Sequence, residues 1–500
     1  MTTQLDLMDI QGNLVRAYGR FSFPVARYIF LRVHSGEAGR SFVGAVTKSV
    51  TTAATWGSAH GEIEKPTATT NIAFTYAGLE ALGLPRASLA GFPPEFAMGM
   101  KSRRDILGDD GPSAPPNWDN AWHGAPVHIF ISINAQQPQY LELRYAWLMA
   151  LVEQSDGAVS VVPGHRGDGG ADLPYQDAKV GMEHGVPSSK EHFGYTDGIG
   201  DPVFDGLQAP PERVLGRGKQ TRDGWLPLAT GEFLLGHLDE AREYPVAPTP
   251  FLLSRNGSFM VYRKLHQNVG SFNAYLDKEG ATYPGGKELL AAKFVGRWRN
   301  NGAPLVHAPD AAAKEVWDAR FKLATEKEQD TMLSNFTFDD DASGAKCPFS
   351  AHMRRVSPRA SLEPAPGDFD RPGALSDRRR VLRRGLPYGE VKDPQHDNGE
   401  HGIIIMMMGA SISRQFEFVQ QQWVNYGNDF KAGNDKDIIL GNHGVKPPSK
   451  AVIQVDPDGD DAPYFLQNIP RLVETRGGDY FFLPSMTALR MIAQGRIDPS

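Results

Sequence analysis

The sequence contains a single cysteine, Cys347, among its 500 residues. One thiol cannot form an intramolecular disulfide, nor can it supply a metal cluster held by cysteines alone. Long apolar runs are also missing, because the longest, Ile403 to Met408, is far shorter than the ~20 residues that a membrane-spanning helix needs. At the start of the sequence no basic stretch leads into an apolar segment, so no secretory signal is predicted. We therefore expect a cytoplasmic protein without a membrane anchor.

Positive charge is not in excess. The chain has 52 Lys and Arg residues against 59 Asp and Glu residues, a net charge of −7. This balance gives no overall basic surface for nucleic acid or for an anionic membrane, although a local basic pocket remains compatible with it. Apolar residues make up 40% and charged residues 22%, which is typical of a globular protein. A chain of this length favours two or three packed units over one.

Strand and helix patterns alternate in both halves of the chain. The first half has strand patterns at 27–33, 72–76, 127–134 and 158–162, and a helix pattern at 141–152. In the second half, strand patterns at 259–263, 403–408 and 480–483 are each followed by a helix pattern, at 269–276, at 412–423 and from Met486. The pattern predicts two α+β units with mostly antiparallel sheets, which we assign to residues 1–222 and 223–500.

A glycine-rich and acidic segment runs from Phe193 to Pro202. Its glycines allow close backbone approach to a flat or bulky group, and Asp197 presents a carboxylate between two of them. The glycine spacing fits neither a phosphate loop nor a dinucleotide fingerprint. An ordinary surface turn is the alternative, because Asp-Gly is a common turn dipeptide.

A second segment, from Cys347 to Arg359, contains one histidine, His352, followed closely by arginines. One imidazole and one thiol do not complete a zinc site. One imidazole does suffice as the axial ligand of haem, and nearby guanidinium groups suit the haem propionates. The alternative is a surface histidine among solvated arginines.

A third segment, from Arg378 to Tyr388, is a basic run interrupted by apolar residues. Its pattern allows one of the two arginines Arg383 and Arg384 to point inward and the other outward. A solvated face is the alternative, since basic runs of this length are usually exposed.

Taken together, these segments resemble the dye-decolorizing peroxidase family over nearly the whole chain. The family's Gly-x-x-Asp-Gly signature is matched at 194–198 and its proximal-histidine segment at 347–355. Its Arg-Gly-x-Pro-Tyr-Gly element is matched at 384–389, with Arg383 in the distal position. Weaker matches lie at 9–13, 415–420 and 478–484. The length, the missing export signal and the insert after Arg359 are similar to the longer cytoplasmic branch.

The resemblance implies two ferredoxin-like domains, with one haem b per chain held mainly by the second. It implies that His352 is the iron ligand and that Asp197 and Arg383 are the catalytic residues. Hydrogen peroxide is the expected oxidant, and bulky aromatic compounds (anthraquinone and azo dyes, phenolics) are the expected reductants. The residues expected to contact the cofactor are His352, Phe193, Thr196, Asp197, Gly198, Ile199, Arg354, Arg355, Arg383 and Phe416.

The sequence does not identify the carboxylate that orients His352, for which Glu417 and Asp429 are guesses. Tyr388 is one candidate for a surface residue that relays electrons. Gly385 stands where some shorter relatives place an asparagine, so asparagine assistance to peroxide binding is not expected. An aspartate with an ordinary pKa near 3.9 predicts an acidic optimum for dye oxidation.

Two other functions stay open at this point. A haem carrier or iron-release protein without peroxidase turnover would share His352 but would need neither Asp197 nor Arg383. A non-haem hydrolase would use Asp197 with His184 or His192. The sequence also leaves a homo-oligomer open.

Overall fold

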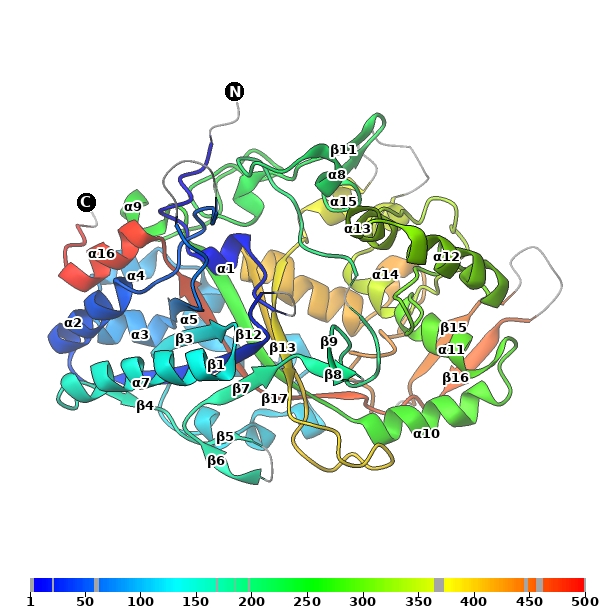
Figure 1. The fold of residues 1–500 in the computed structure, drawn as a ribbon, viewed down its shortest axis with the longest axis horizontal. Coiled ribbons are helices and arrows are strands. Elements are labelled where there is room, and N and C mark those ends of the chain that lie inside the picture. The colour runs from blue at the N-terminus through cyan, green and yellow to red at the C-terminus, as the bar shows by residue number, and fades with distance from the viewer. Residues whose placement is uncertain are drawn as a thin grey trace.

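The computed structural model describes residues 4–19, 22–57, 63–167, 170–183, 185–196, 198–363, 373–444, 448–455 and 462–498. One nine-stranded sheet runs through the centre of the molecule (Figure 1). Its strands follow the order β13-β14-β12-β17-β2-β3-β1-β4, with β7 also paired to β1, and the neighbouring strands are antiparallel. The predicted antiparallel arrangement is confirmed.

The first half of the chain supplies the five strands at one side of this sheet. The strand pairs β1–β3 and β2–β3 are regular over seven residues each, since apolar and β-branched side chains recur along all three strands. Their bounds are β1 Val25–Val33, β2 Ala68–Phe74, β3 Ile129–Ala135, β4 Val159–Val161 and β7 Gln176–Lys179.

The second half supplies the other four strands. Strand β12 is buried along almost its whole length, because β14 and β17 flank it on either side. The bounds are β12 Ser258–Gln267, β13 Leu382–Tyr388, β14 Gly402–Gly409 and β17 Val473–Leu483. The sequence patterns missed β13, because its arginines resemble a solvated run.

The two groups of strands meet at a narrow junction, where Phe482 of β17 pairs with Phe74 of β2. Each group is an antiparallel sheet with helices of its own, which confirms the predicted α+β class with two ferredoxin-like units. The boundary between residues 222 and 223 stays a prediction.

Helices cover both groups of strands. In the first half, α2 and α7 lie beside the sheet, and α16 returns from the chain's end to pack against α2 (Figure 1). Helices α10 to α14 gather at the other end of the molecule. The longer helices are α2 Gly36–Thr47, α3 Tyr76–Ala81, α5 Pro94–Ser102, α7 Pro138–Gln154, α10 Val269–Gly280, α11 Gly286–Val295, α12 Ala311–Leu323, α13 Glu326–Ser334, α14 His352–Val356 and α16 Met486–Gln494.

Shorter elements fill the connections. The predicted helix at 412–423 consists of two π-helical segments, η7 Ile412–Glu417 and η8 Val419–Val424. Short helical turns are α1 Gly12–Val15, α4 Arg86–Ala90, α6 Arg104–Leu107, α8 Pro211–Val214, α9 Phe251–Ser254, α15 Ala374–Asp377, η1 Gly111–Ser113, η2 Pro115–Asn117, η3 Asn120–Trp122, η5 Thr230–Glu232, η6 Arg359–Leu362 and η9 Asn428–Phe430. Small hairpins pair β5 His165–Arg166 with β6 Asp172–Leu173, β8 Gly181–Glu183 with β9 Val186–Ser188, β10 Lys219–Thr221 with β11 Gly224–Leu226, and β15 Lys450–Ile453 with β16 Tyr464–Gln467.

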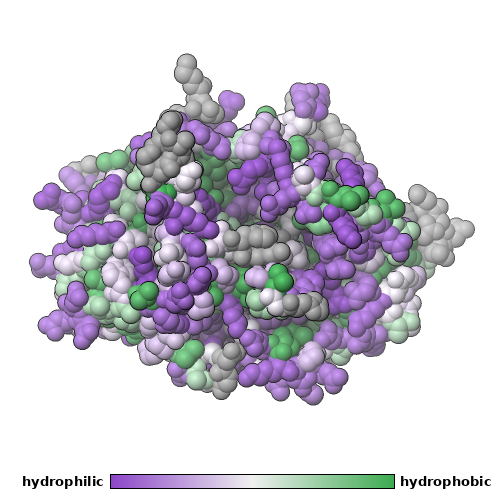
Figure 2. Space-filling view, in the orientation of Figure 1, coloured by the Kyte–Doolittle hydropathy of each residue, from purple (hydrophilic) through white to green (hydrophobic). Residues whose placement is uncertain are grey.

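The face of the molecule in Figure 2 is mostly hydrophilic, with hydrophobic residues in separate patches. The apolar side chains of the central strands lie inside instead, in a core that extends from Ile29 of β1 to Phe481 of β17. Among the described residues, no helix combines the length and the apolar character that crossing a membrane requires.

Candidate active site

Two adjoining cavities lie beside β12, β14 and β17, in the half of the sheet formed by the C-terminal strands. Their volumes are about 1200 and 910 Å³, including the space at their openings to solvent. Both are lined by His352 and Arg383 and by the aliphatic side chains of Ile199, Leu265, Val356, Ile405, Leu440 and Val473. Most residues of their walls follow residue 222, as the expected haem-binding role of the second unit requires.

His352 is the first residue of α14, and its ring is held by a buried carboxylate. Its Nδ1 lies 2.8 Å from Oδ2 of Asp437, whose side chain is fully buried. The backbone N–H groups of Ile439 and Leu440 donate to the other oxygen of Asp437, each at 2.8 Å. Burial alone would raise the pKa of Asp437, but the imidazole of His352 and the backbone donors hold it below its ordinary value. An ionised Asp437 keeps the proton of His352 on Nδ1 and leaves Nε2 as the ligand atom.

Neither guess for this carboxylate was right. Glu417 accepts hydrogen bonds from Arg103 at 2.6 and 2.8 Å and from the hydroxyl of Tyr480 at 2.9 Å. Asp429 accepts from the indole N–H of Trp423 at 3.0 Å. The true partner, Asp437, follows His352 by 85 residues, and no local pattern in the sequence connects the two.

The glycine-rich segment forms part of the cavity wall. Phe193, Thr196 and Gly198 line the second cavity, and Ile199 lines both. The carboxylate of Glu191 closes this loop, because it accepts the backbone N–H groups of Phe193 and Tyr195 at 2.8 and 2.7 Å. Phe193, Thr196, Gly198 and Ile199 therefore lie at the cavity wall, and their contact with a cofactor stays a prediction. Asp197 lies outside the described residues.

Arg383 and Arg384 are neighbours on β13 and point to opposite faces of the strand. Arg383 lines both cavities, and its Nη2 donates to the carbonyl of Gly200 at 3.4 Å. Arg384 instead forms an ion pair with Asp201 at 2.7 Å, while Oδ1 of Asp201 accepts the backbone N–H of Arg383 at 3.3 Å. The structure thus separates the two arginines as the pattern allowed, although both are held inside the fold.

Phe416 lines the first cavity from η7, as expected. Tyr388, by contrast, has only 1% of its surface exposed, so its use as a surface relay was a wrong expectation. His192 binds the carbonyl of Tyr388 at 3.0 Å and lines neither cavity, whereas His184 lies outside the described residues.

The structure does not bring Arg354 and Arg355 to the cavities. Both are fully buried, and each fastens a loop. The guanidinium group of Arg354 pairs with Asp341 at 2.8 Å and donates to the carbonyl of Cys347 at 2.8 Å. Arg355 donates to backbone carbonyls of the 423–435 region, including that of Trp423 at 2.9 Å. These guanidinium groups stabilise the segment around His352 and do not face the cofactor space.

Comparisons with known proteins agree with this site. Residues 9–166 match the model of the DyP dimeric alpha+beta barrel domain. A dye-decolorizing peroxidase of Mycetinis scorodonius is 27% identical over 452 residues, which cover 86% of this chain and 77% of the relative. The multifunctional dye peroxidase of an Amycolatopsis species is 26% identical over 511 residues, which cover 98% and 96%.

Solved structures show the same relationship over the whole fold. An ancestral D-type dye-decolorizing peroxidase superposes with a TM-score of 0.74 at 26% identity, over 98% of this chain and 99% of the other. A DyP-type peroxidase from Auricularia auricula-judae superposes with a TM-score of 0.75 at 23% identity, over 98% and 100%. Sequence and fold agree, and over nearly its whole length the chain is similar to dye-decolorizing peroxidases.

Proposed function

We propose that this protein is a haem b peroxidase in which the imidazole of His352 would bind the haem iron. The observation that carries the proposal is the hydrogen bond between His352 and the buried Asp437 at the wall of the cavity. Nε2 of His352 forms no hydrogen bond with any of the described residues. This atom is therefore available to bind a metal ion. An imidazole whose other nitrogen donates to a carboxylate is a strong donor to a metal.

The rest of the cavity fits the same cofactor. Aliphatic side chains from β12, β14 and β17 suit the flat apolar surface of a porphyrin, and arginines suit its carboxylate groups. When bound, haem supplies the iron centre at which the O–O bond of hydrogen peroxide is cleaved.

The side chains of this protein have three separate tasks in that reaction. Asp437 accepts a hydrogen bond from the Nδ1–H group of His352 and so strengthens the imidazole as an electron donor. The guanidinium group of Arg383 lies in the cavity, where it stabilises negative charge on peroxide oxygen. Asp197 takes the proton from one peroxide oxygen and returns it to the other. Its neighbours Thr196 and Gly198, which line the cavity, support this role.

Asp197 also sets the expected pH dependence. A carboxylate with an ordinary pKa near 3.9 is a better match to an acidic medium than to a neutral one. We therefore propose an acidic optimum for dye oxidation. A rate profile with its maximum above about pH 7 contradicts Asp197 as the main proton acceptor.

The proposed substrates are hydrogen peroxide and bulky aromatic reductants, namely anthraquinone or azo dyes and phenolics. A solved dye-decolorizing peroxidase of the same fold was obtained in complex with 2,6-dimethoxyphenol, which supports phenolic reductants. A haem carrier is the alternative, and it would show only slow turnover with bleaching of the haem.

The test is an absorbance spectrum of the purified protein followed by peroxide-driven oxidation of an anthraquinone dye. The wild type should show a Soret band and rapid turnover, and His352→Ala should lose both. His396→Ala is the matched control, because His396 is exposed and pairs with Asp393 outside the cavities. A His352→Ala protein with full haem content and unchanged turnover overturns the proposal.

A further inference from the structure

Among the described residues, the wall of the first cavity has more cationic than anionic side chains. Among the described residues of its wall are five arginines and one carboxylate, that of Asp109. Charges withdrawn from water need a partner of opposite sign, because desolvation otherwise costs several kcal/mol. The excess of guanidinium groups therefore indicates an anionic ligand.

Three of these arginines are already engaged elsewhere. Arg471 pairs with Asp110 and donates to the carbonyl of His443 at 3.0 Å. Arg379 is half-buried, and its guanidinium group lies 4.0 Å from the ring centroid of Phe418. Arg383 has the catalytic position described above. Arg263 and Arg380 are the two arginines of the cavity wall that remain as candidate ligands for an anion.

Arg263 projects from β12, and 4% of its surface is exposed. Its Nη2 contacts Asp109 and Thr475, whereas its Nε and Nη1 atoms have no hydrogen-bond partner among the described residues. Its neighbour Lys264 points to the other face of the strand and pairs with Asp119 at 2.7 Å. Arg263 thus reaches the cavity with three of its five N–H donors unused among the described residues.

Arg380 lies just before β13, with 9% of its surface exposed, and lines the same cavity. No described residue forms a hydrogen bond or an ion pair with its guanidinium group. Burial lowers its pKa, and the nearby Arg383 lowers it further, although Asp377 opposes them. An anionic partner in the cavity would remove this penalty.

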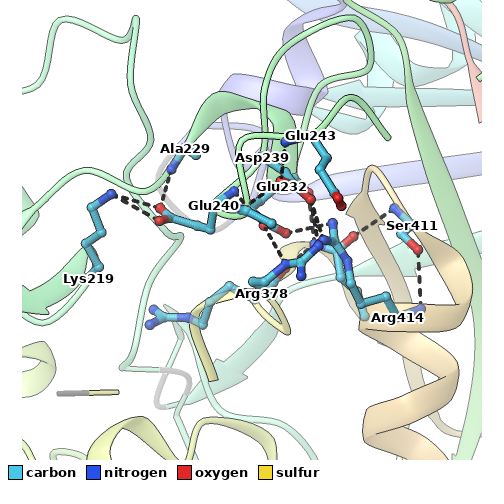
Figure 3. A network of polar contacts seen from close by, with 12 residues as sticks. Lys219, Ala229, Glu232, Asp239, Glu240, Glu243, Arg378, Ser411 and Arg414 are labelled. Carbon is cyan, nitrogen blue, oxygen red and sulfur yellow. Dashed lines mark hydrogen bonds and ion pairs between the residues drawn. The ribbon is translucent and has the colours of Figure 1, made fainter. Parts of the chain in front are cut away.

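A polar network holds the residues next to Arg380 in the sequence and its hydrogen-bond partner Gln415 (Figure 3). Arg378, two residues earlier, turns away toward Asp239, with which it forms an ion pair at 2.8 Å. Glu232 and Asp239 also hold Arg414, at 2.9 and 2.6 Å. Gln415, next to Arg414, donates to the carbonyl of Arg380 at 2.6 Å. The backbone of Arg380 is therefore held by Gln415, which lines the same cavity.

We infer that Arg263 and Arg380 bind the two propionate carboxylates of the haem, the task that the sequence alone assigned to Arg354 and Arg355. The inference rests on the proposed function. Guanidinium and carboxylate groups form paired, charge-assisted hydrogen bonds. Both arginines line the cavity, and Nε and Nη1 of Arg263 have no partner among the described residues.

The test compares haem with its dimethyl ester, in which both carboxylates are uncharged. Wild type, Arg263→Gln and Arg380→Gln are each reconstituted with either compound, and the rate of transfer to excess apomyoglobin is measured. The wild type should lose the ester at least tenfold faster than haem. Each variant should lose haem about tenfold faster than the wild type but should lose the ester at an unchanged rate.

Arg104→Gln is the matched control and should behave as the wild type, because Arg104 is exposed, pairs with Asp105 at 3.5 Å and lines neither cavity. Because Arg263→Gln leaves Asp109 without its cation, the double variant Arg263→Gln/Asp109→Asn serves where the single variant does not fold. Equal acceleration for haem and ester, or none for either, overturns the inference. Absence of a Soret band in the reconstituted wild type overturns the proposed function instead.

Discussion

The Nδ1 atom of His352 lies 2.8 Å from Oδ2 of Asp437, and this contact joins the start of α14 to a loop 85 residues further along the chain. Two backbone N–H groups of that loop fix the other carboxylate oxygen. The orientation of the imidazole therefore depends on a folded loop as well as on its own helix.

Asp437→Asn should weaken the donor strength of His352 without removing it. We expect a more positive haem reduction potential and a 10- to 100-fold slower reaction with hydrogen peroxide, the usual cost of losing such a carboxylate. Spectroelectrochemical titration and initial rates measure both effects. Asp429→Asn is the matched control, because Asp429 binds Trp423 and does not contact His352. An unchanged potential in Asp437→Asn contradicts the assigned role.

Arg383→Leu should reduce kcat/KM for hydrogen peroxide by about 100-fold or more, because the cavity loses the cation that stabilises peroxide charge. Steady-state rates at varied peroxide concentration measure this value. If Arg383 dominates peroxide cleavage, Asp197→Asn leaves most of the peroxide reaction intact. If Asp197 dominates, Asp197→Asn should slow the reaction with peroxide more than Arg383→Leu does.

Glu232, the fully buried carboxyl group in Figure 3, should make stability fall as pH rises. Burial raises the pKa of Glu232 to about 7, although Arg414 and the backbone N–H of Glu240 oppose this shift. The folded state then holds the proton more tightly than the unfolded state, so this contribution is complete below about pH 4.5 and is lost by about pH 7. Its slope is at most about 1.4 kcal/mol per pH unit.

Thermal unfolding of the wild type and of Glu232→Gln between pH 4.5 and 7.5 tests this sign. The advantage of the wild type over the variant should shrink with rising pH. Asp239→Asn is the contrasting variant, because Arg414 and other hydrogen-bond donors lower the pKa of Asp239 despite its burial. The advantage of the wild type over Asp239→Asn should therefore stay constant across this range and shrink only below about pH 4. If the stability difference from the wild type depends on pH in the same way for both variants, the opposite pKa shifts of Glu232 and Asp239 are refuted.

Gly385 should not tolerate a side chain. Its φ is +141°, and an added Cβ would lie 1.8 Å from the carbonyl oxygen of Ile404 on the paired strand β14. Gly385→Ala should lower the melting temperature, by an amount equivalent to at least about 1–3 kcal/mol, and should displace the neighbouring Arg383. In Gly124→Ala the new methyl group meets only open space and the far end of Arg32, so its melting temperature should stay that of the wild type.

The sequence by itself determined the class of fold and indicated haem as the cofactor, with a histidine as the residue that binds it. Apolar runs with strand or helix periodicity predicted β1, β3, β14 and α7, because such patterns depend on neighbouring residues along the chain. The same holds for His352, Arg383 and the glycine-rich segment, whose residue types and order carry the family resemblance.

Only the tertiary structure decided which charged groups meet at the cavity. Arg354 and Arg355 lie next to His352 in sequence, yet they bind loop carbonyls and Asp341. Unused donors belong instead to Arg263 of β12, and Arg380 lines the same cavity. Such pairings join residues from 13 to 154 positions apart. They follow from strand order and burial, which the local pattern of residues does not contain.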